Sequence, residues 1–100
     1  MPSRPVVLVT GAARRIGRAI ALDLAAHGFD IALHCHAASA ESAATLVELR
    51  GLGARAEAFT ADLADEAATR ALLPAVALAF GRVDALVNNA SRFAYDDAAS

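Results

Sequence analysis

The sequence predicts an α/β protein in which a parallel sheet is covered by helices on both faces, and three observations lead to this prediction. Short β-branched and aliphatic runs alternate with longer segments whose apolar residues recur at helical spacing. Glycines stand where several of these segments give way to the next. The order is strand then helix three times, followed by a fourth strand, which requires crossover connections between parallel strands.

The first strand and helix are predicted within residues 5–28. Residues 5–10 form an apolar run that ends at Gly11, which is typical of a strand buried on both faces. The helix is expected to end at residues 27–28, where a histidine precedes a glycine. Its apolar side is predicted from the residues that recur at helical spacing, which are Ile16, Ala19, Ile20 and Leu24.

The second pair of elements follows the same pattern. Residues 31–35 are predicted to form a strand. The next helix is expected to stop near residues 51–53, which contain two glycines. Its predicted apolar residues are Leu46, Leu49 and Leu52.

The last elements are a third strand over residues 56–60, a third helix over residues 65–80 and a fourth strand over residues 85–88. One face of the third helix is predicted to carry Leu72, Val76 and Phe80. Pro74 lies inside this helix, and an interior proline removes a hydrogen bond at a cost of about 3 kcal/mol. We therefore expect a kink or a break there.

Length and composition limit the partners and the number of domains. One hundred residues, 57% hydrophobic and 20% charged, fit one domain over residues 1–100. The net charge is −2 and the nine basic residues are scattered arginines, so no nucleic-acid partner is expected. The most apolar stretch, residues 71–80, is shorter than the roughly 20 residues that cross a bilayer, so no membrane segment is expected. A single cysteine and the lack of a signal-peptide core indicate a cytoplasmic protein.

The turn between the first strand and the first helix carries the strongest local signal. Gly11 allows a tight turn, and Gly17 allows the backbone to approach a pyrophosphate. The helix N-terminus supplies free N–H groups and a partial positive charge. Ala13 stands where the common Gly-x-Gly-x-x-Gly pattern has its second glycine, so a purely structural turn is the alternative.

This turn resembles the Thr-Gly-x-x-x-Gly-x-Gly turn of the short-chain dehydrogenase/reductase family, with Arg15 in place of the middle glycine. Residues 61–63 (Ala-Asp-Leu) and residues 84–91 (Asp-Ala-Leu-Val-Asn-Asn-Ala-Ser) resemble the same family. The resemblance covers all 100 residues and implies the first β-α-β-α-β-α-β portion of a Rossmann-type doubly wound sheet. It also implies an oxidoreductase that acts on a small molecule and, in the whole protein, a homotetramer.

The resemblance assigns roles to individual residues. Asp62 would contact the adenine amino group with Leu63 beside the ring, and Asn89 and Ala90 would line the nicotinamide ribose. The alternatives are that Asp62 caps the next helix and that Asn89 and its neighbour Asn88 close a strand end. The cofactor-binding residues implied in this way are Gly11, Arg14, Arg15, Ile16, Gly17, His36, Ser39, Asp62, Leu63, Asn89, Ala90 and Ser91.

Arg15, Ser91 and Phe93 resemble the pteridine reductase branch of the family. Members of that branch stack a pterin between an aromatic ring and the nicotinamide, with an arginine touching phosphate and substrate. The implied substrate-binding residues are therefore Arg15, Ser91 and Phe93, and the implied substrate is a pterin or a dihydrofolate-like compound. Reduction of another carbonyl or imine compound, with Phe93 in the core, is the alternative.

The expected cofactor is NADP(H). NAD-binding domains of this type place an acidic residue about 20 residues beyond the glycine turn, where residues 36–39 read His-Ala-Ala-Ser. The first acid after the second strand is Glu41, and Arg14 stands where NADP-preferring members of the family often carry a basic residue. His36 and Ser39 are expected to bind the 2′-phosphate, although Ala37 replaces the family's next basic residue.

The run His34-Cys35-His36 suggests a metal site at first sight. Strand side chains alternate between faces, so Cys35 would point away from both histidines. We therefore expect no metal site, and we expect Cys35 to be a small buried residue.

Enzymes of this family use a catalytic tyrosine, a lysine four residues after it and a serine. None of these three residues has a match in this sequence. Tyr95 is the only tyrosine, Ala99 stands four residues after it, and the sequence contains no lysine. We expect no catalytic residue in this chain and interpret Ser100 as a truncation that leaves the outer edge of the fourth strand unpaired. A complete, non-catalytic dinucleotide-binding module is the alternative.

Overall fold

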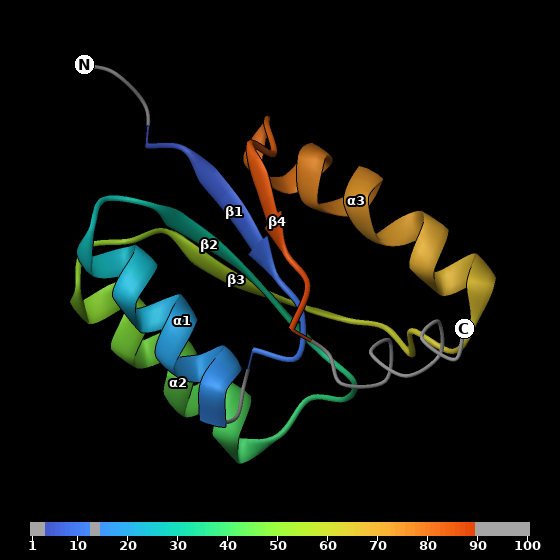
Figure 1. Cartoon of the computed structure of the whole chain (residues 1–100), viewed down its shortest axis with the longest axis horizontal. Coiled ribbons are helices and arrows are strands. Elements are labelled where there is room, and N and C mark those ends of the chain that lie inside the picture. Colours follow the sequence, from blue (N-terminus) through green and yellow to red (C-terminus); the bar gives the residue numbers. More distant parts are fainter. Residues whose placement is uncertain (1–3, 13–14, 90–100) are drawn as a thin grey trace.

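The computed structural model describes residues 4–12 and 15–89. Their strands form one parallel sheet in the order β3-β2-β1-β4, with α1 and α2 on one face and α3 on the other (Figure 1). The strands are β1 (Val6–Val9), β2 (Asp30–Cys35), β3 (Ala56–Thr60) and β4 (Ala85–Val87). The helices are α1 (Arg15–Ala26), α2 (Ala40–Gly51) and α3 (Glu66–Phe80). The predicted fold class and the predicted order of elements are confirmed.

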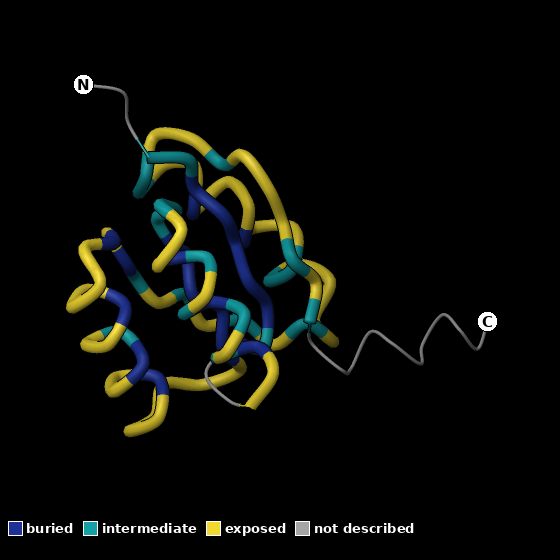
Figure 2. Tube along the Cα trace, turned by 60° about the vertical axis from the view of Figure 1, so that its left-hand side comes forward, coloured by how far each residue is buried: buried dark blue, intermediate teal, exposed yellow. Residues whose placement is uncertain are grey.

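Each face of the sheet carries its own apolar cluster. Alternate residues of one strand enter different clusters, as the two-residue period of a strand requires. The cluster under α1 and α2 contains Val7, Val9, Ile31, Leu33, Ala21, Ala25 and Leu49. The cluster under α3 contains Val6, Leu8, Ala32, Leu72 and Val76. Figure 2 shows that buried residues follow the central strands while the outer faces of the helices are exposed.

The buried side of α1 differs from the predicted one. Ile16 is 68% exposed and Ala19 is also exposed, whereas Ile20 and Leu24 are half-buried. The buried residues are Gly17, Ala21 and Ala25. Because these small residues recur every four positions, the helix can lie close against the sheet, and the larger aliphatic side chains flank the contact.

The end of α2 also differs in detail from the prediction. Leu52 caps the helix and is 47% exposed, and the buried residues of α2 are Ser42, Thr45 and Leu49. Gly53 follows with a φ of +92°, a left-handed conformation that favours glycine. The helix therefore ends one residue before the last predicted leucine.

Pro74 does not break α3, so the expected break is wrong, while the expected kink stays a prediction. The helix runs continuously from Glu66 to Phe80, with Asp65 as its N-cap. Pro74 and Arg70 are both exposed, so water can reach the Arg70 carbonyl that lacks its usual N–H donor. Leu72 and Val76 are buried, as predicted.

Strand β4 forms one edge of the described sheet. It pairs with β1 through Val7 and Ala85, Leu8 and Leu86, and Val9 and Val87. Within the described residues no strand pairs with its other side, and Leu86 is 51% exposed. The predicted open edge is therefore present in the part of the chain that the structure describes.

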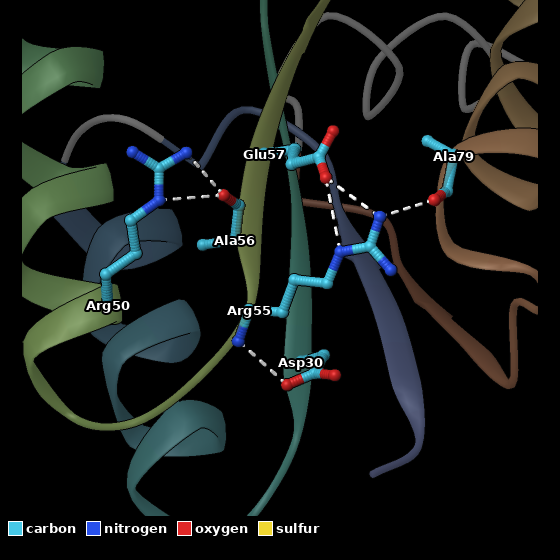
Figure 3. Close-up of polar contacts among 6 residues, drawn as sticks. All are labelled: Asp30, Arg50, Arg55, Ala56, Glu57 and Ala79. Atoms are coloured by element: carbon cyan, nitrogen blue, oxygen red, sulfur yellow. Dashed lines mark hydrogen bonds and ion pairs between the residues drawn. The ribbon is translucent and has the colours of Figure 1, made fainter. Parts of the chain in front are cut away.

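Arginines join the elements at the amino ends of β2 and β3 (Figure 3). The Arg55 N–H donates to Asp30 Oδ1 over 2.9 Å, and its guanidinium donates to Glu57 and to the Ala79 carbonyl at the end of α3. Arg50 of α2 donates to the Ala56 carbonyl over 2.7 and 3.0 Å. These contacts stabilise the end of the sheet that lies opposite the candidate site.

Candidate functional site

The loops that follow the strands meet at one edge of the sheet because all the strands are parallel. Backbone hydrogen bonds extend the strand pairing into these loops. The Thr10 N–H donates to the Val87 carbonyl, and the Ala12 N–H donates to the His34 carbonyl, both over 3.0 Å. On the other side of β2, the Ala61 N–H donates to the Cys35 carbonyl over 3.2 Å. Open α/β sheets bind ligands at this carboxyl edge.

The turn after β1 and the start of α1 are in unusually close contact. A Cβ atom on Gly17 would lie 2.2 Å from the Gly11 carbonyl oxygen and 2.6 Å from Asn89 Nδ2. Both distances are shorter than any real Cβ contact, so only glycine fits at this position. Gly11 itself has a φ of +63°. The structure thus gives Gly17 a role within the protein, while its predicted approach to a pyrophosphate remains a prediction.

Arg15 begins α1 with a φ of +47°, in the left-handed region that favours glycine. A side chain in this conformation costs about 1–2 kcal/mol. This strain explains physically why the family pattern carries a glycine here. Arg15 is exposed and lines a hollow of about 770 Å³ between α1 and α2, and backbone strain of this kind is frequent at functional sites.

The end of β4 is tied to the same turn. The Asn89 N–H donates to Thr10 Oγ1 over 2.9 Å, and Asn89 Nδ2 donates to the Gly11 carbonyl over 3.3 Å. Thr10 Oγ1 lies 3.0 Å from Asn88 Oδ1. The two asparagines therefore close the strand end, and contact of Asn89 with a nicotinamide ribose remains a prediction.

Asp62 and Leu63 follow β3 at the same edge. Asp62 Oδ1 accepts from the Ala64 N–H over 2.9 Å, and Asp65 Oδ1 caps α3 by accepting from Ala67 and Ala68. The alternative in which Asp62 caps the helix is therefore wrong. Leu63 packs against the apolar cluster under α3, and no contact here tests its predicted position beside adenine.

A pocket of about 500 Å³ adjoins the glycine turn. Its lining residues are Gly11, Cys35, His36, Ala37, Ala38, Ser39 and Glu41. The structure thus brings the predicted residues His36 and Ser39 to one pocket with Gly11. Ser39 also caps α2 by accepting from the Ser42 N–H over 3.1 Å.

Glu41 lines this pocket as well, although the sequence analysis did not place it at the site. It also lines the hollow that contains Arg15 and Arg18. Glu41 thus brings an acidic residue to the pocket where a 2′-phosphate was predicted. Sequence spacing alone does not show this, because the first turn of α2 carries Glu41 back beside the end of β2.

His34 is a second residue that the sequence analysis did not include in the site. It is 3% exposed, and its Nδ1 accepts from the Gly11 N–H over 3.0 Å. Its Nε2 lies 2.9 Å from the Ala61 carbonyl oxygen. Burial lowers the pKa of His34 below 6.5 and nearby His36 lowers it further, against the opposing effect of the bond to Ala61. The available signal was a polar residue within an otherwise apolar strand.

Cys35 is buried, as predicted. Burial raises the pKa of its thiol, and a hydrogen bond with Ser42 acts in the opposite direction. Residues 4–12 and 15–89 contain no group of three or more His, Cys, Asp or Glu side chains that could hold a metal ion. No helix within the same ranges is long and apolar enough to cross a membrane.

Several predicted residues lie outside the residues that the structure describes. They are Arg14, Ala90, Ser91, Phe93 and Tyr95. The roles of the first four remain predictions, and no role was predicted for Tyr95.

The sequence profile of the short chain dehydrogenase family matches residues 5–99. The chain belongs to this family. It is 40% identical over 83 residues to the 3-oxoacyl-[acyl-carrier-protein] reductase FabG of Staphylococcus aureus, covering 83% of this chain and 34% of the relative. The chain therefore spans about a third of the length of the curated relatives it matches.

Solved structures of short-chain dehydrogenase relatives have the same fold. A 3-oxoacyl-[acyl-carrier protein] reductase from Brucella melitensis in complex with NAD has a TM-score of 0.81 and 47% identity, over 90% of this chain and 34% of that one. A dehydrogenase from Burkholderia cenocepacia with bound NADP has a TM-score of 0.81 and 37% identity, over 86% of this chain and 34% of that one. Similar structures therefore hold either nicotinamide dinucleotide.

The strain at Arg15 leads to a stability prediction. In the whole protein, Arg15→Gly should be more stable than Arg15→Ala by about 1 kcal/mol, because only glycine adopts this φ without a steric cost. Arg18, one turn into α1, provides the control, and there the glycine variant should be less stable than the alanine variant by about 0.5–1 kcal/mol. Denaturant unfolding measures all four variants. If the glycine and alanine variants had the same order of stability at positions 15 and 18, the result would contradict the strain at Arg15.

Burial of neutral His34 leads to a pH prediction. Between the ordinary histidine pKa of 6.5 and the lower folded-state pKa, the unfolded chain binds a proton at His34 that the folded chain does not. The free energy of unfolding should therefore fall as the pH drops below about 6.5. His34→Asn should lose this part of the pH dependence, whereas His27→Asn, at an exposed position in the turn after α1, should retain it. Unfolding curves from about pH 5 to about pH 8 test this, and equal slopes for wild type and His34→Asn would contradict it.

Proposed function

We propose that this chain forms the cofactor-binding part of an NADP(H)-dependent oxidoreductase. The observation that carries the proposal is the cradle in which Gly17 allows α1 to approach the Gly11 turn, beside the pocket that reaches His36 and Ser39. The N-terminus of α1 supplies N–H groups and a partial positive charge next to this turn, which suits a pyrophosphate. The chain's membership of the short-chain dehydrogenase family also supports a dinucleotide as the ligand.

The described residues fit parts of a dinucleotide along the carboxyl edge of the sheet. The turn between Gly11 and Gly17 would hold the phosphates, Asp62 the adenine and Asn89 the nicotinamide ribose. The bound cofactor would supply hydride transfer. In this proposal, the acid/base residues belong to the part of the protein beyond this chain, because the chain spans only about a third of its relatives' length.

The choice of NADP(H) rests on the charges near the ribose. His36 and Ser39 line the pocket with hydrogen-bonding groups, and Arg14 is expected to add a positive charge. Glu41 opposes this, since its carboxylate lines the same pocket and would repel a 2′-phosphate. We propose that the basic and neutral groups outweigh Glu41, so that NADP(H) binds more tightly than NAD(H).

Fluorescence titration of the whole protein with NADPH and NADH tests this choice. NADPH should bind more tightly, and Arg14→Ala should reduce its advantage by a factor of about 10 to 100, since one charge-assisted hydrogen bond contributes about 1.5–3 kcal/mol. Glu41→Gln should strengthen NADPH binding more than NADH binding, because it removes the repulsion. Glu66→Gln, the same change on the opposite face of the sheet, should alter neither affinity. Equal wild-type affinities for the two nucleotides would overturn the proposed preference.

For the substrate, we propose a pterin or dihydrofolate-like compound. Arg15 supports this, since its strained position at the start of α1 suggests that its guanidinium serves a ligand. Ser91 and Phe93 are the other two residues in this proposal. The second candidate is a carbonyl compound, which the 40% identity to a 3-oxoacyl-[acyl-carrier-protein] reductase favours.

Steady-state kinetics of the whole protein distinguish these two substrates. Phe93→Ala should lower kcat/KM for dihydropteridine or dihydrofolate about 10-fold, because a stacked ring contributes about 1–3 kcal/mol. Phe93→Tyr retains the ring and should keep most of the activity. Absence of pterin turnover in the wild type, together with reduction of an acetoacetyl thioester, would establish the carbonyl alternative. A natural protein of 10.2 kDa would instead favour a non-catalytic binding module.

A further inference from the structure

His34 joins two loops that are distant in sequence. Its Nδ1 accepts from the Gly11 N–H, 23 residues earlier, over 3.0 Å. A ring nitrogen that accepts carries no proton, so the neutral ring carries its hydrogen on Nε2 and donates it to the Ala61 carbonyl, 27 residues later, over 2.9 Å. The backbone carbonyl of His34 also accepts from the Ala12 N–H over 3.0 Å. One buried residue thus contacts both loops.

The order of the strands explains why a residue of β2 makes this link. Gly11 follows β1 and Ala61 follows β3, and β2 lies between these two strands in the sheet. The two loops therefore do not pair directly through the sheet. A side chain at the end of β2 can reach the loops on both sides at once, and His34 does so with its two ring nitrogens.

Both loops belong to the proposed cofactor site. Gly11 opens the turn for the phosphates, and Ala61 precedes Asp62, the proposed adenine contact. The Gly11 N–H is held by His34, so the conformation of this turn depends on the imidazole as well as on its own glycines. A shift of His34 would change the spacing between the two parts of the site.

We propose that His34 is a positioning residue that sets the spacing between the phosphate-binding turn and the adenine-binding loop, and thereby the affinity for an intact dinucleotide. This inference rests on the proposed function, because it assumes that one ligand spans both loops. A histidine that only stabilises the core would affect every ligand of the site equally. A residue that sets the spacing affects a long ligand more than a short one.

Calorimetric titration of the whole protein with NADP⁺, NAD⁺ and AMP distinguishes these cases. AMP carries adenine and a single phosphate but no nicotinamide ribose, so it can shift to fit a changed spacing, whereas a dinucleotide is held at both of its ends. His34→Ala should weaken the tighter dinucleotide about 10-fold or more and AMP by less than about 3-fold, since an unpaired buried polar group costs about 1–3 kcal/mol. His27→Asn, at an exposed position in the turn after α1, is the control and should change neither affinity.

Two conservative variants separate the two hydrogen bonds and remain informative if His34→Ala does not fold. In His34→Asn, the side-chain amide oxygen lies near the position of the histidine Nδ1 and can accept from the Gly11 N–H. In His34→Gln, the side-chain amide nitrogen lies near the position of the histidine Nε2 and can donate to the Ala61 carbonyl. Hydrogen exchange at the Gly11 N–H should stay slow in His34→Asn and become faster in His34→Gln. The Asn and Gln variants should each bind the dinucleotide more tightly than His34→Ala does. If His34→Ala does not fold, each of these two variants should still bind the dinucleotide with more than about one-tenth of the wild-type affinity.

The outcomes separate this inference from the proposed function. Wild-type protein that binds neither NADP⁺ nor NAD⁺ would overturn the proposed function, and the role of His34 with it. Wild-type binding that the folded His34 variants leave unchanged would overturn the positioning role alone. Equal weakening of AMP and the dinucleotides would also overturn it and leave His34 as a core residue.

Discussion

The close approach of α1 to the turn after β1 is the constraint on which the rest of the site depends. A single Cβ atom at Gly17 would overlap the Gly11 carbonyl and the Asn89 amide, which belong to two different loops. The helix would then have to move away from the sheet. Because Ala21 and Ala25 continue the same small-residue face, such a movement would open the cluster under α1 and α2 as well. The turn, the strand end at Asn89 and part of the core thus share one requirement.

Polar groups at the carboxyl edge of the sheet form hydrogen bonds with one another within the protein itself. Thr10 accepts from the Asn89 N–H, and His34 bonds to Gly11 and Ala61. Among the residues that the structure describes, no buried side-chain nitrogen or oxygen lacks a hydrogen-bond partner. A polar network that is fully satisfied in this way keeps its geometry, because every displacement would leave a buried group unpaired.

Arg15 shows a local cost at the candidate site, and Glu41 places an acidic residue there. Arg15 takes a backbone conformation that suits glycine, and Glu41 brings a carboxylate to a pocket otherwise suited to phosphate. Glu41 lies in the first turn of α2, where an acidic side chain is favourable, so only the Arg15 conformation is a cost to the fold. Positions that go against a local rule without a structural gain are expected mainly where a ligand is bound.

The sequence by itself determined the class of fold, the order of the strands and helices, and the family motif at the first turn. Hydrophobic periodicity and glycine positions are local properties, so most element boundaries could be predicted to within a residue or two. His36 and Ser39 could be placed near Gly11 because parallel strands end at one edge of the sheet. Only the tertiary structure decided which face of α1 is buried, that α3 continues through Pro74, and that Glu41 and His34 belong to the site. The physical reason is that these features depend on contacts between distant residues. His34 shows this most clearly, because its role depends on β2 lying between β1 and β3.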